Sequence, residues 1–164
     1  MAQALSRPRA AIHGLGNGPR HAFAFETVFS YLEARPDGTF KSKIDVIHAL
    51  QKHGYYVILL FVGLASAELS ILRVSTRKRQ GGHDVPEAKL RSRFPRTQQA
   101  IGMASEVADL TLMFDNSRSV DNAFTLVRAQ RKKETLYDCR DLSFKQDPDL
   151  VKIAGIWLAR VAPQ

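Results

Sequence analysis

Residues 55–62 read YYVILLFV, and a glycine stands on each side of this run, at Gly54 and Gly63. Every side chain in the run is aliphatic, β-branched or aromatic, so the segment has no polar face. Strands that are apolar on both faces are typical of the middle of a parallel sheet that is covered by helices on both sides. We therefore expect residues 55–62 to form a central strand of an α/β domain.

The segments around this strand alternate between strand and helix patterns. Strands are expected at 21–27, 109–115 and 123–130, and helices at 39–52, at 66–79, from Pro86 with a kink or interruption at Pro95, and from Asp147. This alternation predicts an α/β fold with a mostly parallel sheet. Ligands of such sheets bind beyond the carboxyl ends of the strands. That rule points to Glu26 and Thr27, to the region of Gly63, and to Asp115 and Asn116.

Length and composition fit a single globular domain in a reducing compartment. The chain has 164 residues, of which 45% are hydrophobic and 24% charged, close to the average for globular proteins. The single cysteine, Cys139, excludes an internal disulfide. The longest apolar stretch, 55–67, is too short to span a bilayer, and no secretory signal pattern is present at the N-terminus. We expect a cytoplasmic protein without a membrane partner.

Residues 1–20 include a cluster of glycines, Gly14–Pro19, that favours a loop. A Walker A loop requires G-x-x-x-x-G-K-S/T, because its lysine contacts the β- and γ-phosphates and its hydroxyl binds Mg²⁺. The sequence contains neither Gly-Lys-Ser nor Gly-Lys-Thr. We therefore expect residues 1–20 to be a flexible segment and not a phosphate site.

Positive charge is concentrated in one segment of the chain. The net charge of the protein is +8, and residues 73–96 alone hold eight basic side chains against two acidic ones. Such a concentration indicates a polyanionic partner, which can be nucleic acid, phospholipid headgroups or the phosphates of a nucleotide. An ordinary solvated basic helix is the alternative.

The same segment carries a specific motif. Residues 81–86 read GGHDVP, and R-x-R-F-x-R follows at 91–96. The motifs FAFET at 23–27, Y-x-V-x-L-x-F-V-G-L at 55–64 and FDNS at 114–117 occur around it. In this order the motifs resemble the zeta-toxin-like P-loop kinases of bacteria, with residues 77–97 as the lid. The resemblance implies a P-loop-kinase-like three-layer sandwich over residues 21–130, followed by a C-terminal extension over 131–164.

The resemblance also implies a function. It implies phosphorylation of a small substrate such as a UDP-amino sugar, with ATP or GTP as phosphate donor and Mg²⁺ as cofactor. An antitoxin protein is an implied partner.

Site residues follow from the matching motifs. Arg77, Arg93 and Arg96 are the implied phosphate contacts of the lid, and a guanidinium suits this role because its planar fork holds phosphate oxygens. Substrate binding is implied for Glu26 and Thr27, and Asp115 and Asn116 are implied to line the nucleotide site. For each residue a solvated side chain or a local hydrogen bond is the alternative. No metal ligands are expected, since His83 and Asp84 are adjacent and do not share a face in a regular element.

The sequence departs from the family before residue 21. In the family a strand, a Walker A loop and a catalytic aspartate precede the FAFET segment, and residues 1–20 match none of them. We therefore expect a kinase that is incomplete at its N-terminus, inactive or weakly active, and without an assignable catalytic residue. Two alternatives stay open. One is an active kinase in which GLGNGPR at 14–20 replaces the loop, and the other is a nucleic-acid-binding module that uses residues 73–96.

Overall fold

The computed structural model of the chain describes residues 21–163, except residues 39, 80, 82–84 and 146. In chain order its elements are β1 (Leu32–Ala34), β2 (Phe40–Ser42), α2 (Ile44–Lys52), β3 (Ile58–Gly63), α3 (Ala67–Arg79), α4 (Glu87–Ser105), β4 (Leu110–Asp115), the 3-10 turn η1 (Val120–Asn122), β5 (Thr125–Arg131), β6 (Glu134–Asp138) and α5 (Pro148–Val161). The protein is thus an α/β protein, as predicted. No helix in this described part is long and apolar enough to cross a membrane.

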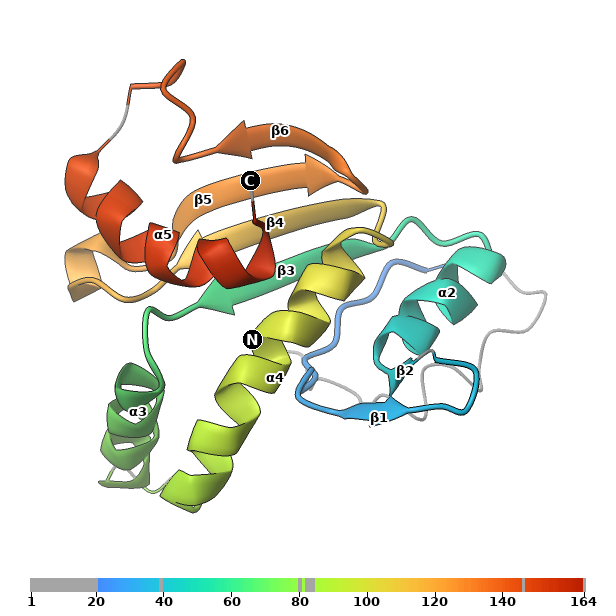
Figure 1. Ribbon diagram of the computed structural model, residues 1–164, viewed down its shortest axis with the longest axis horizontal. Helices are drawn as coiled ribbons and strands as arrows, with labels where there is room; N and C mark the ends of the chain where they lie inside the picture. Colours follow the sequence, from blue (N-terminus) through green and yellow to red (C-terminus); the bar gives the residue numbers. More distant parts are fainter. Residues whose placement is uncertain (1–20, 39, 80, 82–84, 146, 164) are drawn as a thin grey trace.

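The main sheet consists of β3, β4, β5 and β6 in that order (Figure 1). The run 55–62, expected to be a central strand, therefore contributes β3 from Ile58 onward as an edge strand of the described sheet, so that prediction is wrong. Strands β3 and β4 are parallel, with Ile58 opposite Leu110 and Gly63 opposite Asp115. The β4–β5 and β5–β6 pairs are antiparallel, so the expectation of a mostly parallel sheet is wrong and the sheet is mixed. One reason is the missed strand β6, which a two-residue turn joins to β5. Strands joined by so short a turn can pair only in the antiparallel direction.

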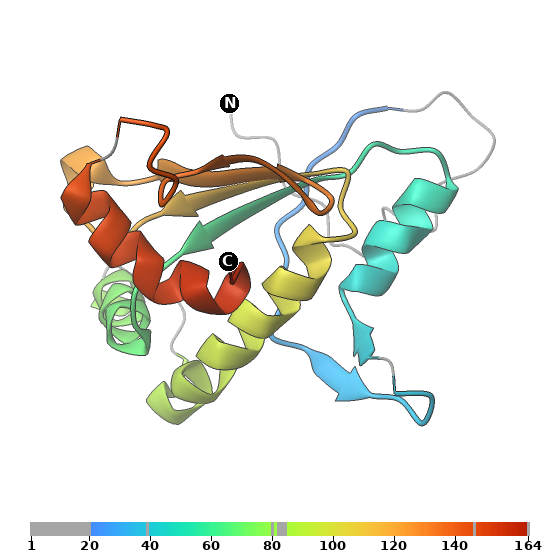
Figure 2. The same ribbon diagram turned by 45° about the horizontal axis from the view of Figure 1, so that its top comes forward.

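Helices α4 and α5 lie against one face of the main sheet (Figure 2). The fully buried Trp157 of α5 contacts Phe61 edge-on, with 5.6 Å between the ring centroids. A Cβ atom at Gly63 would lie 2.4 Å from the Trp157 ring. The close approach of α5 to β3 therefore requires glycine at position 63.

The opposite face of the main sheet, which we call the outer face, is bare of helices in the described part of the chain (Figure 2). Alternation along β3 directs Leu59, Phe61 and Gly63 toward α5 and places Ile58, Leu60 and Val62 on the outer face. These described residues therefore form two layers and not the expected three-layer sandwich.

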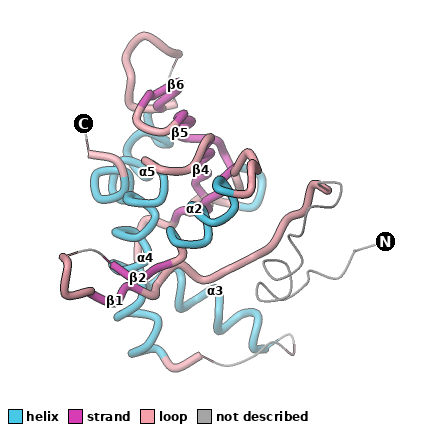
Figure 3. Tube along the Cα trace, turned by 90° about the vertical axis from the view of Figure 1, so that its right-hand side faces the viewer, coloured by secondary structure: helices cyan, strands magenta, loops and turns pink. Residues whose placement is uncertain are grey.

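The N-terminal part of the described chain differs from the predictions. Residues 21–30 have no regular secondary structure, so the strand expected at 21–27 is wrong. The aromatic side chains there pack on other rings and do not extend a sheet. Phe23 contacts Tyr55 edge-on, with 5.5 Å between the ring centroids. Helix α2 starts only at Ile44, because β1 and β2 first form a small antiparallel sheet apart from the main one (Figure 3).

Several local predictions are confirmed. Helix α3 starts after Ser66, whose hydroxyl accepts a hydrogen bond from the backbone N–H of Leu69 (3.3 Å). Asp147 caps α5 by accepting from the N–H of Asp149 (3.0 Å). At Pro95, by contrast, no interruption occurs: helix α4 continues through this residue, so the interruption expected there is wrong.

Candidate phosphate-binding site

Helices α3 and α4 form the connection between the parallel strands β3 and β4, and they lie side by side (Figures 1 and 3). We call them the α3–α4 hairpin. Helix α3 starts just beyond the carboxyl end of β3, and the last turn of α3 carries Arg77, Lys78 and Arg79. Cations are favourable at this end of a helix because of the helix dipole. The hairpin contains most of the basic segment 73–96.

Lys78 and three arginines of the hairpin interact with other residues of the fold. Arg91 pairs with Glu87 of its own helix at 2.8 Å and with Glu68 of α3. The hydrogen bond from Arg91 lowers the pKa of Glu68. Arg73 donates to the side-chain oxygen of Asn116 at 3.2 Å and also to its backbone oxygen. Arg96 donates from Nε to the backbone oxygen of Ser92 at 3.0 Å.

Four other cations of the hairpin differ from these. Arg77, Arg79, Lys89 and Arg93 have no ion pair or side-chain hydrogen bond with another residue that the structure describes. Their charge is therefore not neutralised within the described fold. No carboxylate of the described residues is paired with these side chains, so none of these carboxylates competes there with a phosphate group.

The structure places two of the three predicted lid arginines on one face of a helix. Lys89, Arg93 and Arg96 are spaced by four and three residues on the continuous helix α4, so they form one stripe. Arg77 stands one turn beyond Arg73 on α3, on the side from which Arg73 reaches Asn116. Of the predicted lid 77–97, residues 80 and 82–84 lie outside the described residues, and His83 and Asp84 are among them.

Asp115 and Asn116 are at the carboxyl end of β4, as expected, but both are occupied by hydrogen bonds of the fold. The fully buried Asp115 accepts from Trp157 Nε1 at 2.9 Å and from the hydroxyl of Ser117 at 2.8 Å through one oxygen. Its other oxygen accepts from the backbone N–H of Ser117 at 2.9 Å. These contacts hold the end of β4 against α5. This partnership was not predicted from the sequence, although a buried indole N–H needs an acceptor.

Glu26 and Thr27 lie in the irregular segment 21–30 and not at the end of a strand. The nearby Phe23 packs on Tyr55, which precedes the amino end of β3, whereas Asp115 lies at the carboxyl end of β4. Glu26 is exposed. The structure therefore does not join the predicted substrate residues to the hairpin.

The described residues do not fit a resident Mg²⁺ ion. No group of three His, Cys, Asp or Glu side chains within this part of the chain could hold a metal ion. At the hairpin, Glu68 and Glu87 are paired with Arg91. Both oxygens of Asp115 are taken by Trp157 and Ser117.

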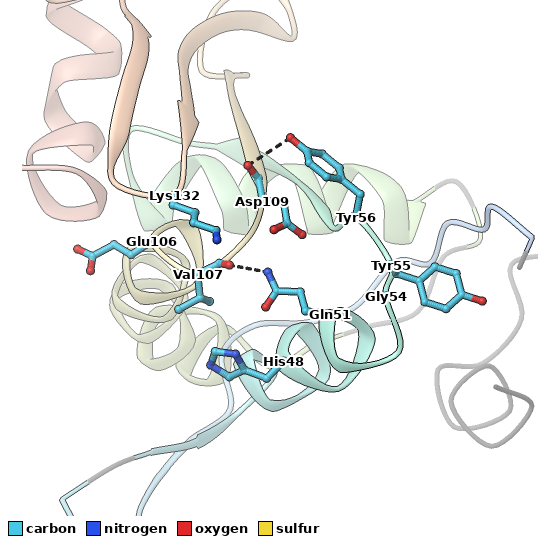
Figure 4. A pocket seen from close by; sticks show the side chains of 9 residues that line it. All are labelled: His48, Gln51, Gly54, Tyr55, Tyr56, Glu106, Val107, Asp109 and Lys132. Carbon is cyan, nitrogen blue, oxygen red and sulfur yellow. Dashed lines mark hydrogen bonds between the residues drawn. The ribbon is translucent and has the colours of Figure 1, made fainter. Parts of the chain in front are cut away.

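An open cavity of about 610 Å³ lies at the opposite end of the main sheet (Figure 4). Part of its polar lining is bonded within the fold. Gln51 donates to the backbone oxygen of Val107 at 2.8 Å, and Asp109 accepts from the N–H of Val57 at 2.8 Å. Glu106 pairs with Lys133 at 3.4 Å. The cavity contains none of the predicted site residues, so the hairpin remains the better candidate.

Comparisons of the chain with protein-family models, with curated proteins and with solved structures find no match. The functional interpretation therefore depends on the residues themselves and on the charge of the hairpin.

Proposed function

We propose that the α3–α4 hairpin binds the phosphate groups of a nucleotide, as the lid of a zeta-toxin-like kinase. The observation that carries the proposal is a set of cations on the hairpin that have no acidic partner among the described residues, namely Arg77, Arg79, Lys89 and Arg93. Arginine remains charged at all physiological pH values and binds two phosphate oxygens at once. A helical scaffold also fixes the spacing of the cations before the ligand arrives.

Arg93 and Arg77 are the central residues of this proposal. Arg93 is half-buried, so part of its side chain is ordered before binding and less conformational entropy is lost when a phosphate binds. Arg96 contributes after it exchanges its bond to Ser92 for one to a phosphate oxygen.

The proposed reaction class is phosphoryl transfer from ATP or GTP to a small substrate such as a UDP-amino sugar, with an antitoxin protein as partner. Cations support this chemistry because they neutralise charge on the transferred group. A kinase also needs a loop that holds the β- and γ-phosphates and a base for the acceptor. The sequence contains no Walker A pattern, and Asp115 is bound to Trp157. We therefore propose nucleotide binding with little or no turnover by this chain.

The proposal is tested by calorimetric titration of the full chain with ATP, with and without Mg²⁺. The double variant Arg77→Ala/Arg93→Ala is expected to weaken binding about tenfold or more, since each charge-assisted hydrogen bond contributes about 1.5–3 kcal/mol. The matched control is Arg131→Ala/Lys133→Ala, which removes the same charge from the β5–β6 turn, where both cations have acidic partners. Equal weakening by the two double variants would contradict a specific site.

Nucleic-acid binding is the second candidate, because residues 73–96 concentrate so much of the positive charge of the chain. A nucleic-acid site loses affinity steeply as salt rises, with a slope set by the number of phosphate contacts. We expect single-stranded DNA and RNA to bind less tightly than ATP at physiological salt. Tighter binding of a 20-nucleotide strand, with a slope of several phosphates, would favour the second candidate.

A further inference from the structure

The outer face of the main sheet is apolar over three neighbouring strands. On β3, Leu60 is 63% exposed and Ile58 is 53% exposed. The register places Ile58 beside Leu110, Leu60 beside Leu112 and Val62 beside Phe114. Phe114 is in turn opposite Leu126 of β5. Because residues directly opposite each other point to the same face of a sheet, these side chains form one continuous surface.

This surface has a defined border at β5 and β6. Tyr137 lies opposite Ala129, and Ala129 lies opposite Leu112, so both belong to the outer face. The ring of Phe144 covers Tyr137 edge-on, with 5.2 Å between the centroids, and Ala129 is buried. The chain thus covers the middle of β5 and β6 on the outer face, whereas the β3–β4 side stays open to solvent within the described residues.

No strand position on the open part of the outer face carries a charge. The strands β3 and β4 read ILLFVG and LTLMFD, and the single ionisable side chain in them, Asp115, points toward Trp157 on the covered face. The basic α3–α4 hairpin also lies on the helix side of the sheet (Figure 2). Two copies can therefore approach through their outer faces without bringing their basic hairpins together.

We propose that the outer face is an interface with a second copy of this chain. Contiguous apolar patches on monomers are small, and larger ones mark interaction sites. The β3–β4 part of the outer face is apolar and carries no charge on its strands, and the exposed Arg131–Glu134 pair lies at the far end of β5 and β6. The β3–β4 part is therefore complementary to itself, as a two-fold interface requires. Two sheets that pack through such faces lie about 10 Å apart and bury both sets of side chains between them.

Analytical ultracentrifugation of the full chain tests this proposal. We expect a dimer with a micromolar dissociation constant, which means mainly dimer at about 100 µM protein. The variant Leu60→Glu is expected to raise the dissociation constant at least about 100-fold, because each copy would bury an unpaired carboxylate in the interface.

The matched control is Ile156→Glu, which places the same charge at an apolar side chain of α5 that is 51% exposed. It is expected to leave the dimer intact. If Leu60→Glu lacks a native circular dichroism spectrum, the neutral double variant Leu60→Thr/Leu126→Thr replaces it, with an expected weakening of about tenfold or more. A monomeric wild-type chain at about 100 µM, or a dimer that Ile156→Glu dissociates as effectively as Leu60→Glu, would overturn the proposal.

Discussion

The two faces of the main sheet use the same strands in opposite ways. On the covered face, Met113 and Trp157 are fully buried and Leu59 is 8% exposed. On the outer face, Leu60 of the same strand is 63% exposed. The run 55–62 is apolar on both faces, so its composition cannot distinguish the face that the chain covers itself from the one that it leaves open. The difference separates residues that hold the fold from residues that are available for association.

The largest expected effect is a contrast between two neighbouring leucines. Leu59→Glu is expected to unfold the protein, because it buries an unpaired carboxylate in the core between β3 and α5. Leu60→Glu is expected to retain a cooperative unfolding transition, since its side chain is largely exposed. Circular dichroism during thermal unfolding measures both. Loss of the folded state in both variants would show that the outer face is as essential to the fold as the covered face.

A smaller effect is expected at Asp138, which joins β6 to α5. Its carboxylate accepts from Arg140 at 2.7 Å and from Arg128, and Arg140 also donates to the backbone oxygen of Ala162 at 2.8 Å. Burial alone raises the pKa of Asp138, but the hydrogen bonds from Arg140 and Arg128 outweigh burial and lower it. The stabilisation by the ionised Asp138 carboxylate is therefore complete above its unfolded-state pKa of about 3.9. It is lost as the pH falls through the lower, folded-state pKa.

Asp138→Asn is accordingly expected to reduce the free energy of unfolding by about 3 kcal/mol at neutral pH, because two arginines lose their buried partner. The variant should also lose less stability than wild type between about pH 5 and pH 3. Urea unfolding at these pH values measures both effects. Asp121→Asn, in the exposed turn η1, is the control and is expected to change stability by less than about 0.5 kcal/mol. If Asp138→Asn loses as much stability as wild type when the pH falls, Asp138 is not a cause of the acid sensitivity.

The smallest expected effect concerns thiol reactivity, which compares a buried with an exposed side chain without altering the fold. Cys139 is buried, and burial raises the pKa of its thiol to about 11. Reaction with a thiol reagent at pH 8 is therefore expected only when the structure opens, because the thiolate is the reactive form. In Ile156→Cys the added, exposed thiol should react at least about 100-fold faster than Cys139. Equal rates for the two thiols would contradict the burial of the β6–α5 junction.

Elements with strong local signals were predictable. Ser66 and Asp147 cap helices where the sequence predicts helix starts, and β4 lies within the expected range 109–115. The strand predicted at 21–27, which contains FAFET, is wrong because its aromatic side chains pack against Tyr55 and the segment does not pair in a sheet. Strand β6, Glu134–Asp138, contains charges at both ends, so its pattern gave no clear strand signal. Its pairing depends on the turn that returns the chain to β5.

The candidate site was predictable only in part. The stripe Lys89, Arg93 and Arg96 follows from helical spacing alone. The hydrogen bonds from Trp157 to Asp115 and from Arg73 to Asn116 join residues about 40 positions apart in the sequence. No local sequence pattern reveals such partners. The hydrogen bond of Arg96 to Ser92 also depends on a side-chain conformation that spacing does not determine. Spacing therefore identifies the cations, and the fold decides which of them are free.

The most direct test of the central claim is to locate where ATP binds on the protein in solution. Amide chemical-shift changes of the uniformly ¹⁵N-labelled chain during an ATP titration report this position. The account predicts that the largest changes occur at Arg77–Arg79 and at Lys89–Arg96 of the α3–α4 hairpin. Changes centred on Gln51, Asp109 and Lys132, which line the cavity at the opposite end of the sheet, or no change at the hairpin at saturating ATP, would contradict it.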